Sequence, residues 1–212
     1  MDLGLKGLKA VITGGTKGIG RAIVQTLAKE GADVAFCARN SEEVASTEKE
    51  FSIYGVKALG TVVDIANAAA LAAWVEAAGK ALGGIDIVVA NVSALAIPAT
   101  EENWSLGFQV DMMGTVRLVT AAMPYLEQSK HASIVTISSV SGREIDFASG
   151  PYGAFKAAII HYTQGLAYHL AGKHIRANTV SPGNTYFTGG VWDQIEQGNL
   201  PAELNDLPYY KK

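Results

Sequence analysis

The chain is poor in cysteine and proline, and neither sign of charge is in strong excess. Its 212 residues include a single cysteine, Cys37, and six prolines. A lone cysteine cannot form an intrachain disulfide, so the fold does not depend on one. The formal net charge is −3, with acidic and basic residues interspersed. The basic footprint of a nucleic-acid-binding protein is therefore absent.

Long hydrophobic runs and metal-ligand patterns are also scarce. The apolar stretch between Asp86 and Glu101 has 14 residues and contains Asn91 and Pro98, whereas a membrane-spanning helix needs about 20. The four histidines show no zinc-ligand spacing, so we expect no metal site. No apolar leader follows Met1, and together with the single cysteine this favours a reducing cytoplasm as the location.

Short apolar runs rich in β-branched side chains recur along the chain. They show little polar alternation, which is typical of strands buried on both faces of a parallel sheet. A length of 212 residues suits one domain spanning 1–212, and 49% hydrophobic residues are ordinary for a soluble globular protein. The expected strands are 9–13, 33–38, 56–63, 85–90, 133–138 and 175–180.

Helical patterns lie between these runs. Ile19, Ile23 and Leu27 recur at four-residue spacing, and Asn67 is a favourable N-cap for a later alanine-rich stretch. The expected helices are 18–29, 41–53, 67–81, 101–127 and 152–172, the fourth being either one bent helix or two successive helices. This alternation predicts a single-domain, doubly wound α/β sheet of Rossmann type, in which ligands bind beyond the carboxyl ends of the strands.

The stretch TGGTKGIG, residues 13–20, lies between the first expected strand and the first helix. Gly14 permits the turn out of the strand, Gly18 lets the backbone approach a pyrophosphate, and Gly20 lets the helix pack close to the sheet. Amides at the helix N-terminus would donate to phosphate oxygens. The spacing G-x-x-x-G-x-G is neither G-x-G-x-x-G nor a P-loop, so this stretch alone also fits a glycine turn without a ligand.

Further motifs follow the glycine loop in a set order. Ser139 comes after the strand 133–138, Tyr152 and Lys156 form Y-x-x-x-K, and 181–183 reads S-P-G. Together with T-G-x-x-x-G-x-G, they resemble the short-chain dehydrogenase/reductase family over about residues 5–195, including its 3-oxoacyl-[acyl-carrier-protein] reductase-like members. The resemblance implies an NAD(P)-dependent oxidoreductase with Ser139, Tyr152 and Lys156 as its catalytic residues.

The resemblance also implies a set of cofactor-binding positions. They come from the glycine loop, from the ends of the expected strands on the adenine side, and from the P-G loop on the nicotinamide side. These positions are Gly14, Thr16, Lys17, Gly18, Ile19, Gly20, Arg39, Asp64, Ile65, Asn91, Tyr152, Lys156, Pro182, Gly183 and Thr185.

The residue types in the Y-x-x-x-K motif suit proton transfer. Tyr152 and Lys156 are four residues apart, so they share one face of a helix. An ammonium beside a phenol favours the phenolate, so we expect Lys156 to lower the pKa of Tyr152 and make it a general acid or base. We expect the Ser139 hydroxyl to hold the substrate oxygen. The expected reaction is hydride transfer between a nicotinamide and a carbonyl or secondary alcohol.

Two basic residues bear on the choice between the two nicotinamide cofactors. The position where NAD-preferring members of the family place aspartate reads Ala38, and Arg39 follows it. Arg39 and Lys17 would bind the 2′-phosphate of NADP(H), although either could be an ordinary surface cation. We therefore expect NADP(H) to be preferred, with NAD(H) possible.

The chain departs from the family pattern in the middle of the sequence. The family's N-A-G segment reads Asn91-Val92-Ser93, and Asp111 stands where the family has the asparagine of a proton relay to the lysine. A carboxylate at this position could pair indirectly with Lys156 and strengthen the relay, or it could damp it. We expect Asp111 to take part in catalysis and activity to be retained.

A further departure lies at the C-terminal end. In the family, a seventh strand and its preceding helix follow the substrate loop, whereas this sequence ends at Lys212 before such a segment. Either the protein continues beyond the sequence, or it lacks the last strand and exposes a sheet edge and part of a subunit interface. The resemblance implies a homodimer or homotetramer.

Apolar residues surround the expected substrate site in a loop of about residues 183–200 and in the segment 94–97. They suit an apolar ketone, an aliphatic or cyclic alcohol, or a 3-oxoacyl thioester, but they could equally be core or oligomer contacts. A second hypothesis is a catalytically silent NADP(H)-binding sensor or scaffold, against which the intact catalytic motif argues. The loop side chains are Tyr186, Phe187, Val191 and Trp192.

Overall fold

The computed structural model describes residues 3–199, and within them one parallel sheet forms the centre of the molecule. Its six strands lie in the order β3-β2-β1-β4-β5-β6, and each neighbouring pair is parallel. The predicted single-domain Rossmann-type sheet is confirmed, and within residues 3–199 no strand follows β6. The strands are β1 (Lys9–Thr13), β2 (Asp33–Ala38), β3 (Ala58–Val62), β4 (Ile87–Ala90), β5 (Ser133–Ile137) and β6 (Arg176–Val180).

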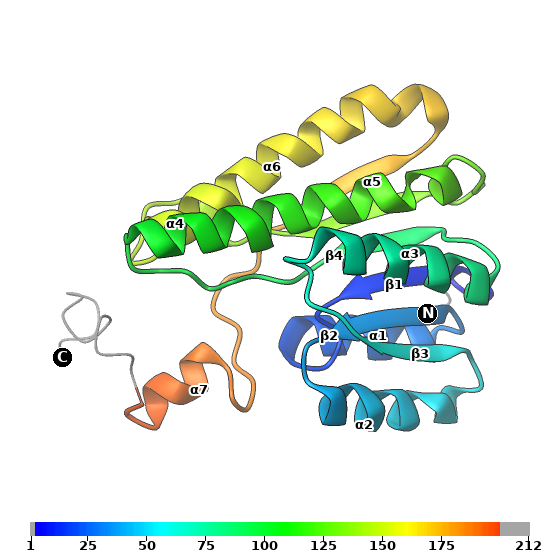
Figure 1. Cartoon of the computed structure of the whole chain (residues 1–212), viewed down its shortest axis with the longest axis horizontal. Coiled ribbons are helices and arrows are strands. Elements are labelled where there is room, and N and C mark those ends of the chain that lie inside the picture. The colour runs from blue at the N-terminus through cyan, green and yellow to red at the C-terminus, as the bar shows by residue number, and fades with distance from the viewer. Residues whose placement is uncertain (1–2, 200–212) are drawn as a thin grey trace.

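Helices pack on both faces of this sheet (Figure 1). On one face, α1 (Gly18–Lys29) and α2 (Ser41–Phe51) cover a core cluster that includes Ile12 and Phe36. On the other, α3 (Ala68–Leu82), α5 (Gly114–Leu126) and α6 (Pro151–Leu170) cover a cluster that includes Val11 and Val88. The uninterrupted apolar runs of the sequence thus supply both cores, as strands buried on both sides do.

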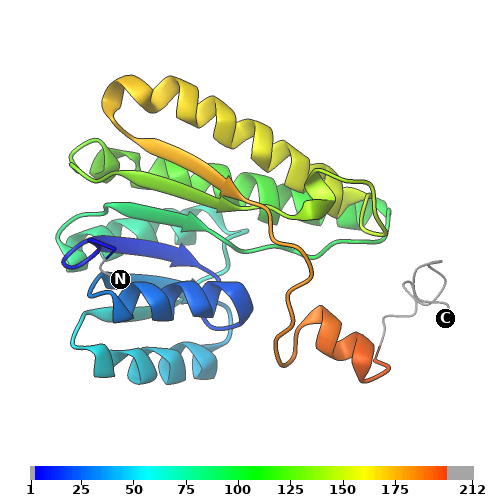
Figure 2. The same ribbon diagram turned by 180° about the vertical axis from the view of Figure 1, so that it is seen from behind.

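The α1 face of the sheet is covered only in part. Figure 2 shows α1 and α2 lying over β1, β2 and β3, whereas no helix lies in front of β5 and β6. An apolar cavity of about 780 Å³ lies on this face, lined by α1 residues such as Ile23 and by Ile87, Val135 and Val180. The outer edge of β6 also has no strand partner within residues 3–199.

The expected helix 101–127 is divided into three parts. They are α4 (Glu101–Gly107), a π-helical segment (Phe108–Met113) and α5. A π-helical turn is wider than an α-helical one and is frequently found at functional sites. Here it carries Asp111, which is buried. The choice between one bent helix and two successive helices is therefore settled as two helices joined by a π-helical segment.

Two further features concern the ends of the fold. A short helix, α7 (Val191–Glu196), lies within the expected substrate loop, and residue 200 of that loop lies outside the described residues. Cys37, near the end of β2, is fully buried, and burial raises the pKa of its thiol to about 12. Within residues 3–199, no helix is long and apolar enough to cross a membrane. In the same residues, no His/Cys/Asp/Glu cluster could hold a metal ion.

Candidate functional site

The glycine loop leads from the end of β1 into α1. Gly14 and Gly18 have φ of +74° and +50°, a region of backbone conformation that favours glycine. A Cβ added to Gly20 would lie 2.0 Å from the carbonyl oxygen of Gly14, so only glycine fits there. The backbone amide of Gly14 donates to the Cys37 carbonyl oxygen over 2.8 Å, which ties the loop to β2. Ile19 faces the apolar cavity on the α1 side.

The N-terminus of α1 differs from those of the next three helices. Side chains of Asn40, Asn67 and Thr100 accept hydrogen bonds from first-turn amides of α2, α3 and α4. Lys17 occupies the N-cap of α1 and makes no such bond through its side chain. The α1 amides are thus left for another acceptor, and such an uncapped helix start behind a glycine turn suits a phosphate group. The residues present therefore fit the pyrophosphate of a dinucleotide.

Asn91, directly after β4, fixes the glycine loop from the other side. Its backbone amide donates to Thr13 Oγ1 over 3.0 Å. Its side-chain amide donates to the carbonyl oxygens of Thr13 and Gly14 over 3.1 and 3.2 Å. Val92 replaces the alanine of the family's N-A-G segment. Its larger side chain fits because Gly14 has no side chain: a Cβ added to Gly14 would lie 2.9 Å from Val92 Cγ2. Asn91 thus positions the loop through contacts with its backbone.

The end of β5 and the start of α6 bring the predicted catalytic residues together. Ser139 follows β5, whereas Tyr152 and Lys156 lie on α6. Lys156 Nζ donates to the carbonyl oxygen of Ile137 over 3.1 Å, and Ser138 Oγ donates to the carbonyl oxygen of Lys156 over 2.8 Å. These two buried bonds hold α6 against β5. Ser139 and Tyr152 come near enough for the serine to act on the pKa of the phenol.

The pKa of Tyr152 is raised, which contradicts the prediction that Lys156 lowers it. Burial is the main cause, and the charges of Asp111 and Asp146 add to it, while the hydrogen bond with Ser139 opposes it. The Lys156 ammonium lies over the face of the Tyr152 ring, 5.6 Å from its centroid. The prediction was wrong because burial outweighs the lysine, whose charge is paired with a carboxylate.

That carboxylate belongs to Asp111. Its Oδ1 lies 3.2 Å from Lys156 Nζ, and its Oδ2 accepts a hydrogen bond of 2.9 Å from the backbone amide of Ala94. The contact with Lys156 is an ion pair rather than a well-directed hydrogen bond, since Oδ1 has no hydrogen-bond partner of good geometry among the described residues. Burial lowers the pKa of Lys156, and Asp111 opposes that effect. The expected indirect pairing is therefore direct.

Two residues in the loop after β5 lead to Ser139 without belonging to any motif identified in the sequence. Ser139 Oγ lies 3.2 Å from Ser141 Oγ, and Ser141 Oγ donates to Asp146 Oδ2 over 2.7 Å. The other oxygen of Asp146 accepts from the amide of Ala148 over 2.9 Å. The sequence places these side chains in a loop at the carboxyl end of a strand, but it does not indicate that they turn toward Ser139.

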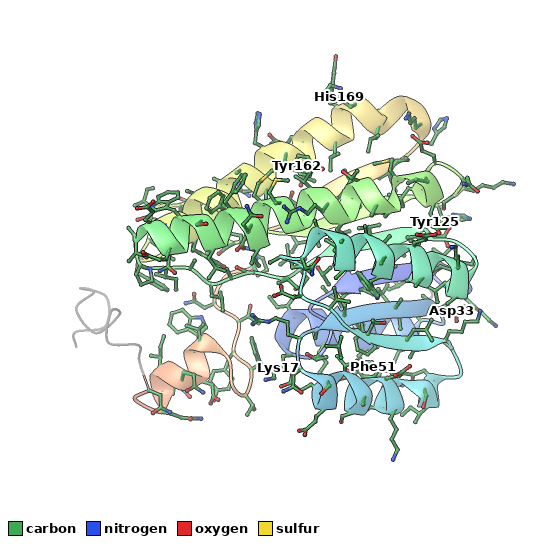
Figure 3. The ribbon with its side chains drawn as sticks, in the orientation of Figure 1. Lys17, Asp33, Phe51, Tyr125, Tyr162 and His169 are labelled. Atoms are coloured by element: carbon green, nitrogen blue, oxygen red, sulfur yellow. The ribbon has the colours of Figure 1, made fainter. Side chains whose placement is uncertain are left out.

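The two cations expected at the 2′-phosphate lie in different surroundings. Lys17 Nζ is 2.7 Å from Glu43 Oε1, and Thr16 Oγ1 donates to Glu43 Oε2 over 3.2 Å. Figure 3 shows Lys17 near the start of α2, the helix that carries Glu43. Arg39 is exposed, and its side chain has no ion pair within residues 3–199. Glu43 is a residue that sequence reasoning missed, because an acid in a first helical turn ordinarily interacts only with its own helix.

The remaining predicted cofactor residues follow the ends of β3 and β6. Asp64 is exposed and Ile65 is buried. The carbonyl oxygen of Pro182 accepts a 3.0 Å hydrogen bond from a backbone amide in the loop after β5, and Thr185 Oγ1 donates to Gly183 over 3.2 Å. The P-G loop is thus attached to the loop that carries the catalytic serine.

The segment 94–97 is attached to the catalytic helix. The carbonyl oxygen of Ala96 accepts a 3.1 Å hydrogen bond from the amide of Tyr152. Leu95 is 49% exposed and has φ of +52°, which is uncommon for a residue with a side chain. Such backbone strain clusters at ligand-binding sites. Leu95 is therefore placed and exposed as a substrate-contacting side chain would be.

The loop before α7 is held by a buried carboxylate. Asp193 accepts from Tyr186 Oη over 2.8 Å and from the amide of Gly189 over 2.6 Å. The hydrogen bond to Asp193 raises the pKa of Tyr186 to about 12. The Trp192 ring meets Phe147 edge to face, with centroids 6.3 Å apart. Of the predicted side chains of this loop, Trp192 therefore contacts the loop after β5.

Phe187 has a different neighbour. A Cβ added to Gly18 would lie 2.7 Å from its ring, so the ring packs directly on the glycine loop. The ring also packs close to Gly190. Phe187 was expected at the mouth of the substrate site, and the structure places it against the cofactor loop.

Comparison with known proteins agrees with this geometry. The family described as short chain dehydrogenase matches residues 8–198. Isoepoxydon dehydrogenase patN of Penicillium expansum is 42% identical over 208 residues, which cover 94% of this chain and 78% of that protein. Dehydrogenase/reductase SDR family member 4 of Sus scrofa is 34% identical over 190 residues, which cover 86% of this chain and 68% of that protein.

Solved structures show the same fold with either cofactor. A short chain dehydrogenase from Burkholderia cenocepacia J2315, in complex with NADP, has a TM-score of 0.82 and 29% identity, covering 92% of this chain and 82% of that one. NAD+-bound xylitol dehydrogenase has a TM-score of 0.83 and 26% identity, covering 91% of this chain and 75% of that one.

Proposed function

Because the chain belongs to the short-chain dehydrogenase/reductase family, the NAD(P)-dependent oxidoreductases of alcohol and carbonyl substrates, we propose that it transfers hydride between NADP(H) and an apolar ketone or secondary alcohol. One observation carries the proposal. Ser139, beyond the end of β5, acts on the phenol of Tyr152 and lowers its pKa, and the buried Lys156 ammonium lies beside the Tyr152 ring. A proton donor, an oxygen-binding hydroxyl and a positive charge thus meet at one place.

In this proposal the protein side chains manage the proton and the substrate oxygen. The nicotinamide, when bound, supplies or accepts the hydride. In reduction, Tyr152 donates its phenolic proton to the carbonyl oxygen, and its raised pKa keeps that proton available at neutral pH. In oxidation, Tyr152 acts in its deprotonated form, and the phenolate oxygen takes the proton of the alcohol. Ser139 holds the substrate oxygen, and Lys156 stabilises the negative charge that develops nearby.

Residues from three loops would hold the cofactor. The uncapped amides of α1 would bind the pyrophosphate, with Asn91 fixing the loop that carries them. Asp64 and Ile65 would lie on the adenine side, and the segment 182–185 on the nicotinamide side. Lys156 would also hold the nicotinamide ribose.

NADP(H) is the proposed preference over NAD(H). No acid stands at Ala38, and Arg39 after it is exposed and without an ion pair among the described residues. Lys17 is paired with Glu43, so a 2′-phosphate would compete with that carboxylate for it. Arg39 is therefore the principal phosphate contact, and Lys17 the secondary one.

A cyclic secondary alcohol or its ketone is the proposed substrate class. Leu95 is exposed in the segment that is attached to Tyr152 through Ala96, and Phe147, in the loop after β5, pairs with Trp192. Both groups offer apolar side chains on segments that adjoin β5 and α6. Two names of similar proteins support this class: isoepoxydon dehydrogenase, and a 7α-hydroxysteroid dehydrogenase complexed with NADH and 7-oxo glycochenodeoxycholic acid. A 3-oxoacyl thioester is the second substrate class to be tested.

A homodimer or homotetramer is the proposed assembly. Trp104, Leu106 and Phe108 lie on α4 and the π-helical segment, and each is more than 40% exposed. Neighbouring apolar side chains exposed in this way support a subunit contact. Light scattering coupled to size exclusion tests the assembly, and a monomer would contradict it.

The function is tested by following NADPH absorbance at 340 nm with cyclic ketones, aliphatic ketones and 3-oxoacyl thioesters. We expect turnover with cyclic ketones and a loss of at least 100-fold in kcat for Tyr152→Phe. The control is Glu144→Gln, which removes an exposed carboxylate from the loop after β5. Its kcat should match that of the wild type. NADPH binding without turnover of any ketone or matching alcohol would contradict the proposal.

A further inference from the structure

The catalytic serine stands at one end of a chain of three hydrogen-bonding side chains. Ser139 Oγ lies 3.2 Å from Ser141 Oγ, which lies 2.7 Å from Asp146 Oδ2. The backbone amide of Ser141 also donates to Ser139 Oγ over 3.2 Å. Ser139 itself is buried, whereas Asp146 is half-buried at the far end of the chain.

The direction of the hydrogen bonds in this chain follows from the number of protons. An ionised carboxylate only accepts, and a serine hydroxyl has one proton to donate. Ser141 gives its proton to Asp146, so its oxygen can only accept from Ser139. The single Ser139 proton is thereby directed toward Ser141. Tyr152 and a substrate oxygen must compete with Ser141 for it.

We propose that Asp146 is a positioning residue that, acting through Ser141, draws the Ser139 proton away from the substrate oxygen. The inference rests on the proposed function of Ser139 and Tyr152. A ketone oxygen only accepts hydrogen bonds and needs the Ser139 proton, whereas an alcohol brings a proton of its own. Asp146 therefore weakens the binding of the ketone relative to that of the alcohol.

The geometry offers a conservative variant. In Asp146→Asn, Oδ1 still accepts from the Ala148 amide, so Nδ2 faces Ser141 and donates to it. Ser141 then turns its proton toward Ser139, and the Ser139 proton is released. Ser141→Ala releases the same proton but keeps the Asp146 charge. Both variants should lower the KM for the ketone about fivefold, the effect of one hydrogen bond, and leave the KM for the alcohol unchanged.

A second measurement does not require activity. The groups around the Tyr152 phenol are Ser139, Asp111 from the π-helical segment, Asp146 from the loop after β5, and Lys156 from α6. A freed Ser139 proton stabilises the phenolate, and loss of the Asp146 charge does so as well. The pKa of Tyr152 should therefore fall in Ser141→Ala and fall further in Asp146→Asn.

The test is a pH titration of 13Cζ-tyrosine by NMR in the full chain, with Tyr152→Phe to assign the signal. Glu144→Gln removes an exposed carboxylate from the same loop and should titrate as the wild type does. Unchanged or raised Tyr152 pKa values in both variants would overturn the inference. A purely structural role would reduce kcat and thermal stability without lowering this pKa. If the wild type reduced no ketone, the proposed function would fail, while the titration would still decide the role of Asp146.

Discussion

Asp111 Oδ1 lies 3.2 Å from the ammonium nitrogen of Lys156, and the two side chains are only 3% and 2% exposed. Removing each ion from water costs several kcal/mol, which the mutual attraction must offset. Burial lowers the pKa of Lys156, and the charge of Asp111 opposes that effect. The positive charge of Lys156 on α6 is therefore supported by Asp111, which lies in the π-helical segment.

Removing the Asp111 carboxylate should destabilise the protein. We expect Asp111→Ala to lower the free energy of unfolding by about 3–5 kcal/mol, because it leaves the buried Lys156 charge unpaired. Urea denaturation measures this change. Glu127→Gln, which breaks the exposed ion pair with Lys173, is the control and should cost less than about 1 kcal/mol. Equal losses in the two variants would contradict the proposed energetics of the buried pair.

Asp111→Asn should keep turnover within a few-fold near neutral pH but change its pH dependence. The asparagine keeps the acceptor for the Ala94 amide but loses the charge that supports the Lys156 ammonium. The pKa of Lys156 then falls further, and the ammonium is lost as pH rises through that lower value. The basic limb of the kcat/KM profile should move to lower pH. If the basic limb of the pH profile stayed at its wild-type position, Asp111 would not be what maintains the charge of the Lys156 ammonium.

Phe187 should hinder cofactor binding, because its ring packs on Gly18, where the pyrophosphate is proposed to bind. We expect Phe187→Ala to lower the Kd for NADPH about fivefold, equivalent to about 1 kcal/mol, as measured by fluorescence titration. Phe155→Ala removes a ring that packs with Trp104 and Phe108 on another part of the surface and serves as the control. Weaker NADPH binding in Phe187→Ala would instead make the ring part of the cofactor site.

Cofactor preference should follow Arg39, Lys17 and the carboxylate of Glu43. The double variant Arg39→Asp with Lys17→Ser should shift preference from NADPH toward NADH, because both proposed phosphate contacts are lost. Glu43→Gln should raise the preference for NADPH about threefold, because Lys17 no longer pairs with a carboxylate. Ratios of kcat/KM for the two cofactors measure both effects. The neighbouring Glu42→Gln is the control, and unchanged NADPH selectivity in the double variant would refute the assignment.

The sequence predicted most of the scaffold because its signals are local. The first strand, the first helix and the second strand match their predicted bounds, since apolar runs and the glycine turn between them mark both ends. The π-helical segment could not be predicted, because the pattern of 101–127 fits both a continuous helix and an interrupted one. Within that segment Asp111 meets Lys156, a contact between residues 45 positions apart in the chain, which local sequence patterns do not reveal.

The sequence predicted that the candidate catalytic residues lie together, but it did not predict the electrostatics around them. The spacing of Tyr152 and Lys156 placed them on one helix, as observed. The direction of the Tyr152 pKa shift depends on burial and on Asp146, and four-residue spacing carries no information about either. Glu43 was missed for a related reason, since its contact with Lys17 depends on how the start of α2 meets the glycine loop.

The reactivity of the Cys37 thiol should report local opening of the sheet at β2. The thiol is fully buried in β2, its pKa is raised to about 12, and its backbone carbonyl holds the glycine loop. A thiol reagent should react only when the sheet opens beside that loop, which also destroys the cofactor site. NADPH at 100 times its Kd should then slow labelling about 100-fold, because it binds only the closed form. Labelling that is independent of NADPH would mean that β2 opens without disturbing the loop above it.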